Sequence, residues 1–479
     1  MKKTLVGREE EKRILRKALE SDEAEMVSII GRRRVGKTFL IKTVYKDHLD
    51  FEITGLQNAP KTEQLQNFAY RLGEASNLSL PVKIPVNWLE AFMLLINYLK
   101  NIDSEKRKVV FLDEIPWLAT HKSGFLRGLS FFWNSWAVDQ NIVVVICGSA
   151  ASWMIQKVIH HRGGLHNRVT KNIFLEPFTL LETELYLNSR NIYFERYQII
   201  QIYMAIGGIP HYLKEIEGGK SATQNIEQIC FSKKGLLQDE FLKLYPSLFS
   251  HAENHIAVIR ALGQQKQGLT RQQIIEGAKI SAGGTIQRVL KELVQSGFIS
   301  DYQPFGKKKK EKLYRLTDEY SLFYLQFIEG KKHEGKDLWH HISQTQNYKT
   351  WSGYAFESIC LKHIPQIKKA LGISGIYAVS YSFYKKGTDE EKGTQIDLLI
   401  DRKDQTINLV EIKFYNEIFS LSKSYAEILS TKKSVFRATT KTRKQIFMVL
   451  ITTFGLKHNK HSLGLIDSVL TMDDLFEPE

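Results

Sequence analysis

Apolar positions along the first part of the chain follow two spacings that alternate. Short, nearly unbroken apolar runs at residues 26–30, 109–112 and 141–147 are typical of strands buried on both faces. Residues 60–104 instead carry apolar side chains three and four positions apart, which predicts helices. Buried strands that alternate with helices predict a parallel sheet between helical layers, and therefore an α/β fold.

A glycine-rich stretch follows the first of these strands. Gly31 and Gly36 enclose four residues, and Lys37 and Thr38 come directly after them. In a phosphate-binding loop, backbone N–H groups surround the phosphates, the lysine reaches the β- and γ-phosphates, and the hydroxyl holds Mg²⁺. A surface turn is the alternative, but the strand before the loop and the helix predicted after it, which favours phosphate at its N-terminus, argue against it. The sequence thus predicts ATP and Mg²⁺ as cofactors, and the candidate nucleotide-binding residues are Gly31, Arg32, Arg33, Arg34, Val35, Gly36, Lys37, Thr38 and Phe39.

Two acids, Asp113 and Glu114, end the second buried strand. Ligands of parallel sheets bind at the carboxyl ends of the strands, so we expect this pair beside the phosphate loop. Asp113 suits Mg²⁺, directly or through water, and Glu114 suits polarising the water that attacks the γ-phosphate. Acids also favour helix N-termini, and the upstream loop is what makes the catalytic interpretation the better one.

Three further polar residues are candidates for the nucleotide site. Ser149 follows the third buried strand, where a side chain can sense the γ-phosphate or cap the next helix. Arg168 ends a basic stretch that starts at residue 160, and an arginine there suits a phosphate. Arg8 lies in a turn before the first predicted helix, a segment that covers the base in many nucleotide-binding folds, although a plain first helix fits the spacing equally well.

The motifs GRRRVGKT, VVFLDE and GSA, with Arg168 and the turn at residues 207–210, resemble the archaeal-type ATPases of the AAA+ superfamily, STAND branch. The resemblance extends over roughly residues 1–230 and implies a Walker A loop, a Walker B pair, a sensor at Ser149 and a phosphate contact of Arg168. It also implies that Gly208 and Pro210 contact the nucleotide from a helical lid. The residues alone indicate only a turn between helices there.

Residues 236–330 predict three helices and two short strands, the order of a winged helix, whose third helix can enter the major groove of DNA. Such a unit can equally serve as a packing element that senses the nucleotide state. A lysine run is usually a solvated loop, but beside a recognition helix it also suits phosphate contact. The exposed positions of the third helix are Thr285, Gln287, Arg288 and Lys291, and the wing carries Lys307, Lys308, Lys309, Lys310 and Lys312.

A second group of charged candidates lies near the C-terminus. Asp397 interrupts an apolar strand, and Glu411 and Lys413 share one side of the next strand. Two carboxylates with a lysine suit Mg²⁺-assisted attack of water on a phosphodiester. Buried acids are costly unless they bind something, and a surface hairpin with its charges in water is the alternative, although the strands are apolar.

This second pattern resembles the PD-(D/E)xK nuclease superfamily and, more narrowly, the DUF234 module that follows such ATPase domains. The resemblance implies that Asp397, Glu411 and Lys413 form the catalytic core and that Glu357, on a predicted helix, is an additional metal ligand. Ile396 stands where the superfamily motif has proline. Some members of such families keep the fold without the activity.

The motifs and the two resemblances together predict an α/β protein with four parts. These are a P-loop NTPase core of the AAA+ type (1–175), a helical lid (176–235), a winged-helix domain (236–330) and an α/β restriction-endonuclease-like domain (345–479). The predicted function is an ATPase that couples its nucleotide state through the winged helix to a Mg²⁺-dependent nuclease. The alternatives are a nucleotide-dependent switch and a DNA-binding regulator, both with an inactive C-terminal domain.

Composition adds expectations about partners and compartment. The chain has 67 Lys and Arg against 52 Asp and Glu, a net charge of +15, which is compatible with nucleic acid, DNA before RNA, and equally with solubility. Three cysteines far apart favour a reducing cytoplasm. No apolar run reaches the roughly 20 residues of a membrane helix, and a homo-oligomer is compatible with the sequence.

Overall fold

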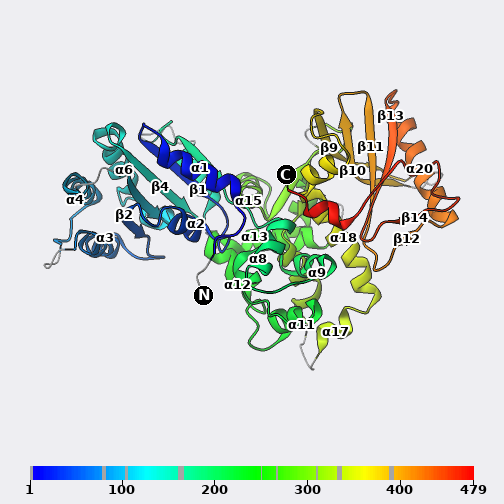
Figure 1. Ribbon diagram of the computed structural model, residues 1–479, viewed down its shortest axis with the longest axis horizontal. Helices are drawn as coiled ribbons and strands as arrows, with labels where there is room; N and C mark the ends of the chain where they lie inside the picture. Colours follow the sequence, from blue (N-terminus) through cyan, green and yellow to red (C-terminus); the bar gives the residue numbers. More distant parts are fainter. Residues whose placement is uncertain are drawn as a thin grey trace. The chain divides into compact units, whose positions relative to one another are not determined.

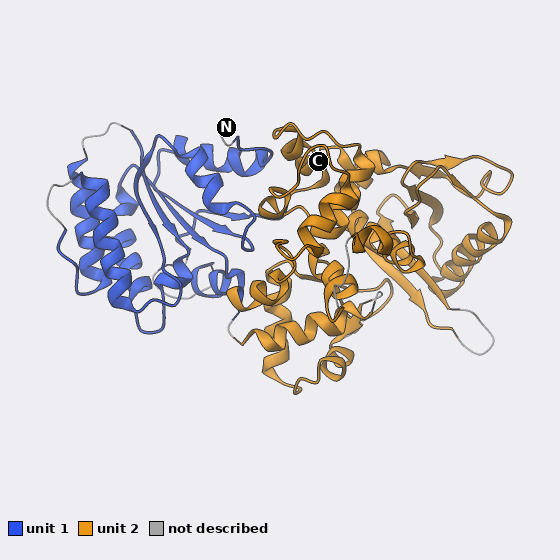
Figure 2. Cartoon of the chain, turned by 90° about the horizontal axis from the view of Figure 1, so that it is seen from below, with its two compact units in different colours: residues 1–177, 248–250 blue, residues 178–247, 251–479 orange. Residues whose placement is uncertain are grey.

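The computed structural model describes residues 4–77, 82–102, 106–159, 165, 167–249, 251–265, 268–308, 311–331, 337–387 and 393–478. The chain divides into two compact units (Figure 2). Unit 1 holds residues 1–177 and 248–250, and unit 2 holds residues 178–247 and 251–479. Among the described helices, none combines the length and the apolar character that crossing a membrane requires.

Unit 1 is built on a parallel five-stranded sheet with the strand order β2-β3-β4-β1-β5 (Figure 1). Every residue of β1 and of β4 is buried, as the unbroken apolar runs predicted. The α/β fold with a parallel sheet is therefore confirmed. The strands are β1 (Glu25–Ile30), β2 (Leu49–Thr54), β3 (Lys108–Asp113), β4 (Ile142–Gly148) and β5 (Lys171–Phe174).

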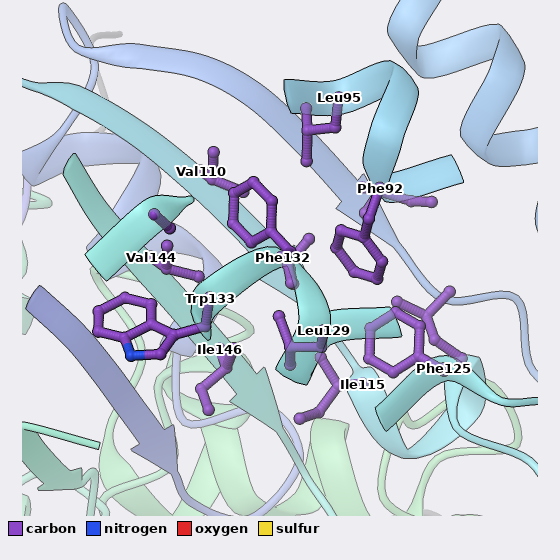
Figure 3. Close-up of a cluster of buried hydrophobic side chains, with 14 of the residues drawn as sticks. Phe92, Leu95, Val110, Ile115, Phe125, Leu129, Phe132, Trp133, Val144 and Ile146 are labelled. Atoms are coloured by element: carbon purple, nitrogen blue, oxygen red, sulfur yellow. The ribbon is translucent and has the colours of Figure 1, made fainter. Parts of the chain in front are cut away.

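Helices cover this sheet, and one face carries a large aromatic core. Alternate residues of β3 and β4, such as Val110 and Val144, pack there against side chains of α4 and α6, including Phe92 and Phe132 (Figure 3). A Cβ added at Gly128 would lie 2.9 Å from the carbonyl oxygen of Trp88, so glycine allows α6 to approach α4 closely. The helices of unit 1 are α1 (Glu9–Glu20), α2 (Lys37–Val44), α3 (Lys61–Ser76), α4 (Trp88–Asn101), α5 (Ile115–Leu118), α6 (Phe125–Ser135) and α7 (Ala151–Met154).

The first half of unit 2 is mainly helical. It begins with α8 (Leu180–Asn188), α9 (Arg196–Ile206), α10 (Pro210–Leu213), α11 (Ala222–Ile226) and α12 (Glu240–Leu248). The three helices and two strands expected farther on are present as α13 (Ala252–Gly263), α14 (Arg271–Ala278), α15 (Gly284–Gln295), β7 (Ile299–Tyr302) and β8 (Leu313–Leu316). A further short strand that was not expected, β6 (Leu269–Thr270), precedes α14. Thr270 caps α14 in a reciprocal pair with Gln273, and β8 pairs antiparallel with both β6 and β7. We call residues 252–316 the middle segment.

The second half of unit 2 holds a mixed sheet with the order β15-β13-β11-β10-β9 (Figure 1). β10 is antiparallel to β9 and β11, whereas β11, β13 and β15 run parallel. The elements are α16 (Glu319–Phe323), α17 (Leu338–Ile342), α18 (Gln346–Lys362), α19 (Ile364–Ala370), β9 (Ala378–Lys385), β10 (Thr394–Arg402), β11 (Thr406–Lys413), β12 (Phe419–Ser420), α20 (Lys423–Thr440), β13 (Gln445–Thr452), β14 (Leu456–Lys457) and β15 (Ser468–Leu470). Apolar residues of α20, such as Leu429 and Phe436, share a core with Leu399 and Leu409 of the sheet.

Candidate functional site

The phosphate loop joins the end of β1 to the start of α2. Gly36 has φ 97°, in the left-handed region that favours glycine. Gly31 is required for a different reason, because a Cβ there would lie 2.4 Å from the carbonyl oxygen of Leu175, whose N–H donates to Ile30 O at 2.7 Å. Glycine at position 31 thus allows the loop to leave β1 in close contact with Leu175, the residue that follows β5.

Lys37 points into this loop. Its ammonium donates to the carbonyl oxygens of Gly31 at 2.7 Å and Arg32 at 3.1 Å, and the residue is only 6% exposed. Val35 is also buried, while Phe39 is more than a third exposed. The lysine is therefore held as a desolvated charge at the place where a phosphate loop binds its ligand.

Thr38 connects the loop to β3. Its hydroxyl donates to Asp113 Oδ2 at 2.8 Å, and the other carboxylate oxygen of Asp113 accepts the N–H of Glu114 at 3.0 Å. The expectation that the acid pair lies beside the loop agrees with this contact. Hydroxyl and carboxylate oxygens are the donors that Mg²⁺ prefers, so Thr38 and Asp113 fit a magnesium nucleotide.

Glu114 has an unusual backbone for a non-glycine residue, with φ 48° and ψ 50°. Its Oε2 accepts two hydrogen bonds from Ser149, from the hydroxyl at 2.9 Å and from the N–H at 3.0 Å. The N-cap of α7 is Ala150, so Ser149 does not take the helix-capping role that the sequence left open. Sequence reasoning named both residues but missed that they contact each other. Adjacent strands β3 and β4 bring their ends together, which only the strand order reveals.

The arginines near the loop have structural contacts. The Arg33 guanidinium lies 6.0 Å from the centre of the Trp117 ring. Arg32 is 5% exposed, and Arg34 adopts φ 73°. Arg8 precedes α1 and donates to the carbonyl oxygen of Glu176 at 2.6 Å, one residue beyond the segment that touches Gly31. Arg8 thereby fixes the segment that follows β5 next to the phosphate loop. A contact between Arg8 and a nucleotide stays a prediction.

Arg168 lies at the opposite end of the sheet. It precedes the start of β5 and borders a surface hollow with Asp22, Glu23 and Asn141, which precede β1 and β4. The phosphate loop follows the carboxyl end of β1, about 20 Å away at roughly 3.3 Å per strand residue. The structure does not bring Arg168 to the loop of its own chain. Residues 160–164 and 166 of the same basic stretch lie outside the described residues.

Gly208 and Pro210 belong to unit 2, and their contact with a nucleotide bound in unit 1 stays a prediction. Within unit 2 Gly208 is a close-packing glycine, because a Cβ would lie 2.0 Å from the carbonyl oxygen of Phe178. Phe178 also donates its N–H to Gly208 O at 2.7 Å. Pro210 begins α10, a position where its missing N–H costs nothing.

The acidic candidates of the C-terminal sheet come together on its central strands. Leu398 pairs with Val410, which places Asp397 and Glu411 at neighbouring positions of β10 and β11. The pairing of β10 with β9 shifts between Ile396 and Leu399, so Asp397 sits at an irregularity of the strand. Burial, followed by the carboxylates of Glu357 and Glu411, raises the pKa of Asp397 to about 7.

Glu411 is surrounded by donors from its own domain. Lys432 Nζ lies 2.7 Å from Oε2, Lys413 Nζ lies 3.2 Å from Oε1, and the Tyr425 hydroxyl also donates to Oε1. Burial would raise the pKa of Glu411, but the two lysines and these hydrogen bonds lower it below its usual value. Tyr425 and Lys432 were missed from the sequence. They are seven residues apart on α20 and therefore share a face of that helix. This spacing was the signal in the sequence that could have identified them.

Glu357 is paired with an arginine from outside the C-terminal domain. Arg315 on β8 donates to Glu357 Oε1 at 2.6 Å, and both side chains are about one-tenth exposed. Within the described ranges, no group of three or more His, Cys, Asp or Glu side chains is placed to hold a metal ion. The residue types of Glu357, Asp397 and Glu411 fit Mg²⁺, but their present arrangement does not form a metal site.

The surface of the middle segment agrees with part of the sequence expectation. Thr285, Gln287, Arg288 and Lys291 on α15 are exposed. Two of the wing lysines lie close to acidic side chains. Lys312 pairs with Asp301, and Lys307 lies 3.6 Å from Glu311. Lys309 and Lys310 lie outside the described residues, and Lys308 is exposed.

The glycine-rich loop between β1 and α2, with an acid pair at the end of β3 two strands away in the sheet, defines unit 1 as a P-loop nucleotide-binding domain. Residues 5–216 match a family model described as an ATPase domain predominantly from Archaea. This part of the chain is an ATPase domain of the archaeal type. Membership of the STAND branch and the DUF234 assignment of residues 345–479 stay predictions.

Several known proteins are similar to this chain. An uncharacterized protein of Methanocaldococcus jannaschii is 23% identical over 415 residues, covering 85% of this chain and 87% of the relative. A Walker-type ATPase of Pyrococcus abyssi covers 67% of this chain and 96% of its own, with 17% identity and a TM-score of 0.49. The ORC2 protein of Aeropyrum pernix, solved as ADPNP-ADP complexes, covers 66% and 91%, with 15% identity and a TM-score of 0.41.

Proposed function

We propose that this protein is a Mg²⁺-dependent ATPase whose nucleotide state controls a C-terminal, metal-dependent nuclease-like site acting on nucleic acid, DNA before RNA. The observation that carries the ATPase part is the hydrogen bond between Thr38 and Asp113, which joins the loop hydroxyl to the acid pair. The archaeal ATPase family match over residues 5–216 supports the same activity.

The residues of unit 1 have distinct roles in this proposal. Lys37 exchanges its contacts with the loop carbonyls for the β- and γ-phosphates, while the loop N–H groups hold the rest of the phosphate chain. Thr38 and Asp113 would hold Mg²⁺, which would neutralise charge on the phosphates. Glu114 orients and deprotonates the attacking water, and to do so it must give up its hydrogen bonds with Ser149. Ser149 then has an N–H and a hydroxyl to offer the γ-phosphate.

Nucleotide binding is tested by titrating the full chain with a fluorescent ATP analogue. Lys37→Ala should weaken binding at least about 100-fold, because each charge-assisted hydrogen bond contributes about 1.5–3 kcal/mol. Lys42→Ala is a matched control, since Lys42 lies on the same helix and pairs with Glu52 at the surface. Equal affinity of wild type and Lys37→Ala would show that the loop is not the nucleotide site.

The nuclease part rests on the acidic group of unit 2. Asp397 and Glu411 are adjacent on two central strands, and the electrostatic influence of Glu357 on Asp397 puts all three carboxylates in one neighbourhood. Lys413 is a third exposed and lies beside Glu411, where it can stabilise a phosphodiester or orient a water. The proposed substrate is nucleic acid, which the net charge of +15 attracts.

Cleavage of plasmid and of single-stranded RNA, with Mg²⁺ or Mn²⁺ and with or without ATP, tests this part. Lys413→Ala should abolish cleavage, and Lys403→Ala, which changes an exposed lysine on the turn after β10, should leave it intact. Cleavage that survives Lys413→Ala would come from a contaminant or another site.

The second candidate function is a nucleotide-dependent switch whose C-terminal domain binds a partner without cutting it. The donors around Glu411 favour this candidate, because two lysines and a tyrosine already satisfy the carboxylate that would hold metal. Absence of cleavage under every condition, together with Mn²⁺ affinity that is unchanged by Glu411→Ala, would favour the switch over the nuclease.

Contacts inside unit 2 provide a route from the predicted lid to the acidic group. A Cβ at Gly207, in the turn after α9, would lie 2.9 Å from Glu319 Oε2, and Glu319 pairs with Lys362 at the end of α18. The same helix carries Glu357. His363, directly after α18, accepts the N–H of Leu180 at the start of α8. A movement of the lid helices would therefore be transmitted to α18.

DNA binding is proposed for the exposed face of α15, with Arg288 and Lys291 contacting phosphates or bases. Replacing both residues by alanine should weaken DNA binding and reduce its salt dependence, because fewer counterions are released. Fluorescence anisotropy at several salt concentrations measures both quantities. An unchanged slope would place the DNA contact elsewhere.

A further inference from the structure

We infer that Arg315 of the middle segment is an internal cation that keeps the acidic group of Glu357, Asp397 and Glu411 closed to divalent metal, and that displacing β8 opens it. This inference rests on the proposed nuclease-like site and adds its regulation. It explains why three carboxylates converge while their present arrangement does not form a metal site.

The pairing of Arg315 with Glu357 is the first observation. The guanidinium lies 2.6 Å from the carboxylate, and the two side chains are 11% and 9% exposed. The charge of Asp397 also acts on Arg315. A guanidinium in this position provides the positive charge that a divalent ion would otherwise supply to both acids.

The origin of Arg315 is the second observation. Among the described cations that pair with Glu357 or Glu411, Lys413 and Lys432 belong to the C-terminal sheet and to α20, which packs on it. Arg315 alone comes from outside residues 345–479. A cation on a separate part of the chain can be withdrawn by a movement of that part, whereas Lys413 and Lys432 move with the site.

The docking of the middle segment is the third observation. Phe305, in the connection between β7 and β8, donates its N–H to Ser382 O on β9 at 2.8 Å. Its ring centre lies 5.4 Å from that of Tyr381 and 5.6 Å from that of Phe436 on α20. The segment that carries Arg315 is therefore attached to two elements that frame the acidic group, and weakening this attachment should loosen Arg315.

Removing the arginine should create a metal site. With Arg315 absent, Glu357 is left as a buried carboxylate without its cation, next to Asp397. Oxygen donors that are already desolvated and lack a partner bind a hard divalent cation strongly. Metal affinity, rather than cleavage, is the direct consequence.

The test is Mn²⁺ titration of the full chain without nucleotide, followed by electron paramagnetic resonance of the free ion. Arg315→Met should bind one Mn²⁺ at least tenfold more tightly than the wild type, and adding Glu411→Gln should remove that gain. Arg260→Met is the matched control. Arg260 also lies in the middle segment, and its ion pair with Glu329 is more exposed than that of Arg315. Its Mn²⁺ affinity should equal that of the wild type.

A second variant tests the inference if Arg315→Met does not fold. Phe305→Ser weakens the docking of the middle segment while all charges stay in place, and it should raise Mn²⁺ affinity at least threefold. Circular dichroism verifies the fold of each variant. Unchanged affinity in the folded variants would overturn the inference.

The outcomes separate the inference from the proposed function. If the wild type already binds Mn²⁺, loses it with Glu411→Gln and does not respond to Arg315→Met or Phe305→Ser, the metal site stands and the role of Arg315 is wrong. If no variant binds Mn²⁺, or if the gain survives Glu411→Gln, the acidic group is not a metal site and both ideas fail.

Discussion

The two candidate sites of this chain hold their acidic side chains in opposite ways. In unit 1, Asp113 and Glu114 accept hydrogen bonds from a threonine hydroxyl, a serine hydroxyl and backbone N–H groups. In unit 2, Glu357 and Glu411 are paired with an arginine and two lysines. Neutral donors can be exchanged for a nucleotide and its metal at small cost, whereas paired charges must be separated first.

The difference indicates which site is ready for its ligand. Neutral donors orient the acids of unit 1 without cancelling their charge, so a cation is still attracted to them. In unit 2 the internal cations cancel most of the negative charge. We therefore expect the nucleotide site to bind its ligand after only small rearrangements. We expect the acidic group to bind metal only after a conformational change that removes a cation.

The largest expected effect concerns Glu114. Glu114→Gln should lower the rate of ATP hydrolysis by about 100- to 10,000-fold, the usual contribution of a positioned base, because the amide cannot take a proton from water. Affinity for ATP should change little, since Thr38, Asp113 and Lys37 remain. Phosphate release and nucleotide titration measure the two quantities. Normal ATP turnover by the Glu114→Gln variant would show that another residue is the general base.

The next effect is on stability. Arg315→Met leaves the Glu357 carboxylate buried without its partner, which should lower the free energy of unfolding by about 3–5 kcal/mol. Arg260→Met breaks the ion pair with Glu329, in which Arg260 is nearly half exposed, and should cost at most about 1 kcal/mol. Urea denaturation of both variants measures the comparison. Equal losses of unfolding free energy in the two variants would mean that the ion pair of Arg315 and Glu357 is not shielded from solvent.

The sequence predicted the nucleotide site in more detail than the acidic group. The loop residues are consecutive, and the acid pair ends an apolar strand, so local spacing was enough to name Gly31, Lys37 and Asp113. The contact of Glu114 with Ser149 depends on β3 and β4 being neighbours, and no spacing in the sequence indicates that order.

The acidic group was predicted only in part because its partners come from distant segments. Asp397 and Glu411 lie on consecutive strands joined by a short turn, so their proximity followed from a hairpin. Arg315 reaches Glu357 from 42 residues earlier in the chain, and Lys432 reaches Glu411 from the next helix. Such long-range contacts depend on tertiary packing, for which hydrophobic periodicity contains no signal.

A third prediction uses the pKa of Asp397, which burial and two carboxylates raise to about 7. A raised pKa means that the folded protein binds a proton that the unfolded chain has released, so stability is fully present below about pH 4 and falls as pH rises to about 7. At about 1.4 kcal/mol per unit the upper limit is about 4 kcal/mol, and solvent near this partly buried carboxyl reduces it to roughly 2 kcal/mol. Asp397→Asn should flatten the dependence, as urea unfolding at several pH values can verify. A slope that persists in the variant must come from other groups.

The smallest expected effect tests whether Arg168 and the phosphate loop lie at opposite ends of the sheet in unit 1. Arg168 lies before β5, with residues that precede β1 and β4, whereas the phosphate loop follows the opposite end of β1. Arg168→Ala should therefore leave the ATP affinity of the isolated chain within about twofold of the wild type, since an arginine side chain spans far less than the roughly 20 Å that separates the two ends. If hydrolysis falls while affinity in dilute solution is unchanged, and the fall grows with protein concentration, Arg168 contacts the nucleotide of a second copy in a homo-oligomer. A large loss of affinity in dilute protein would instead mean that the arginine reaches its own loop, and that the strand order found here does not keep the two apart.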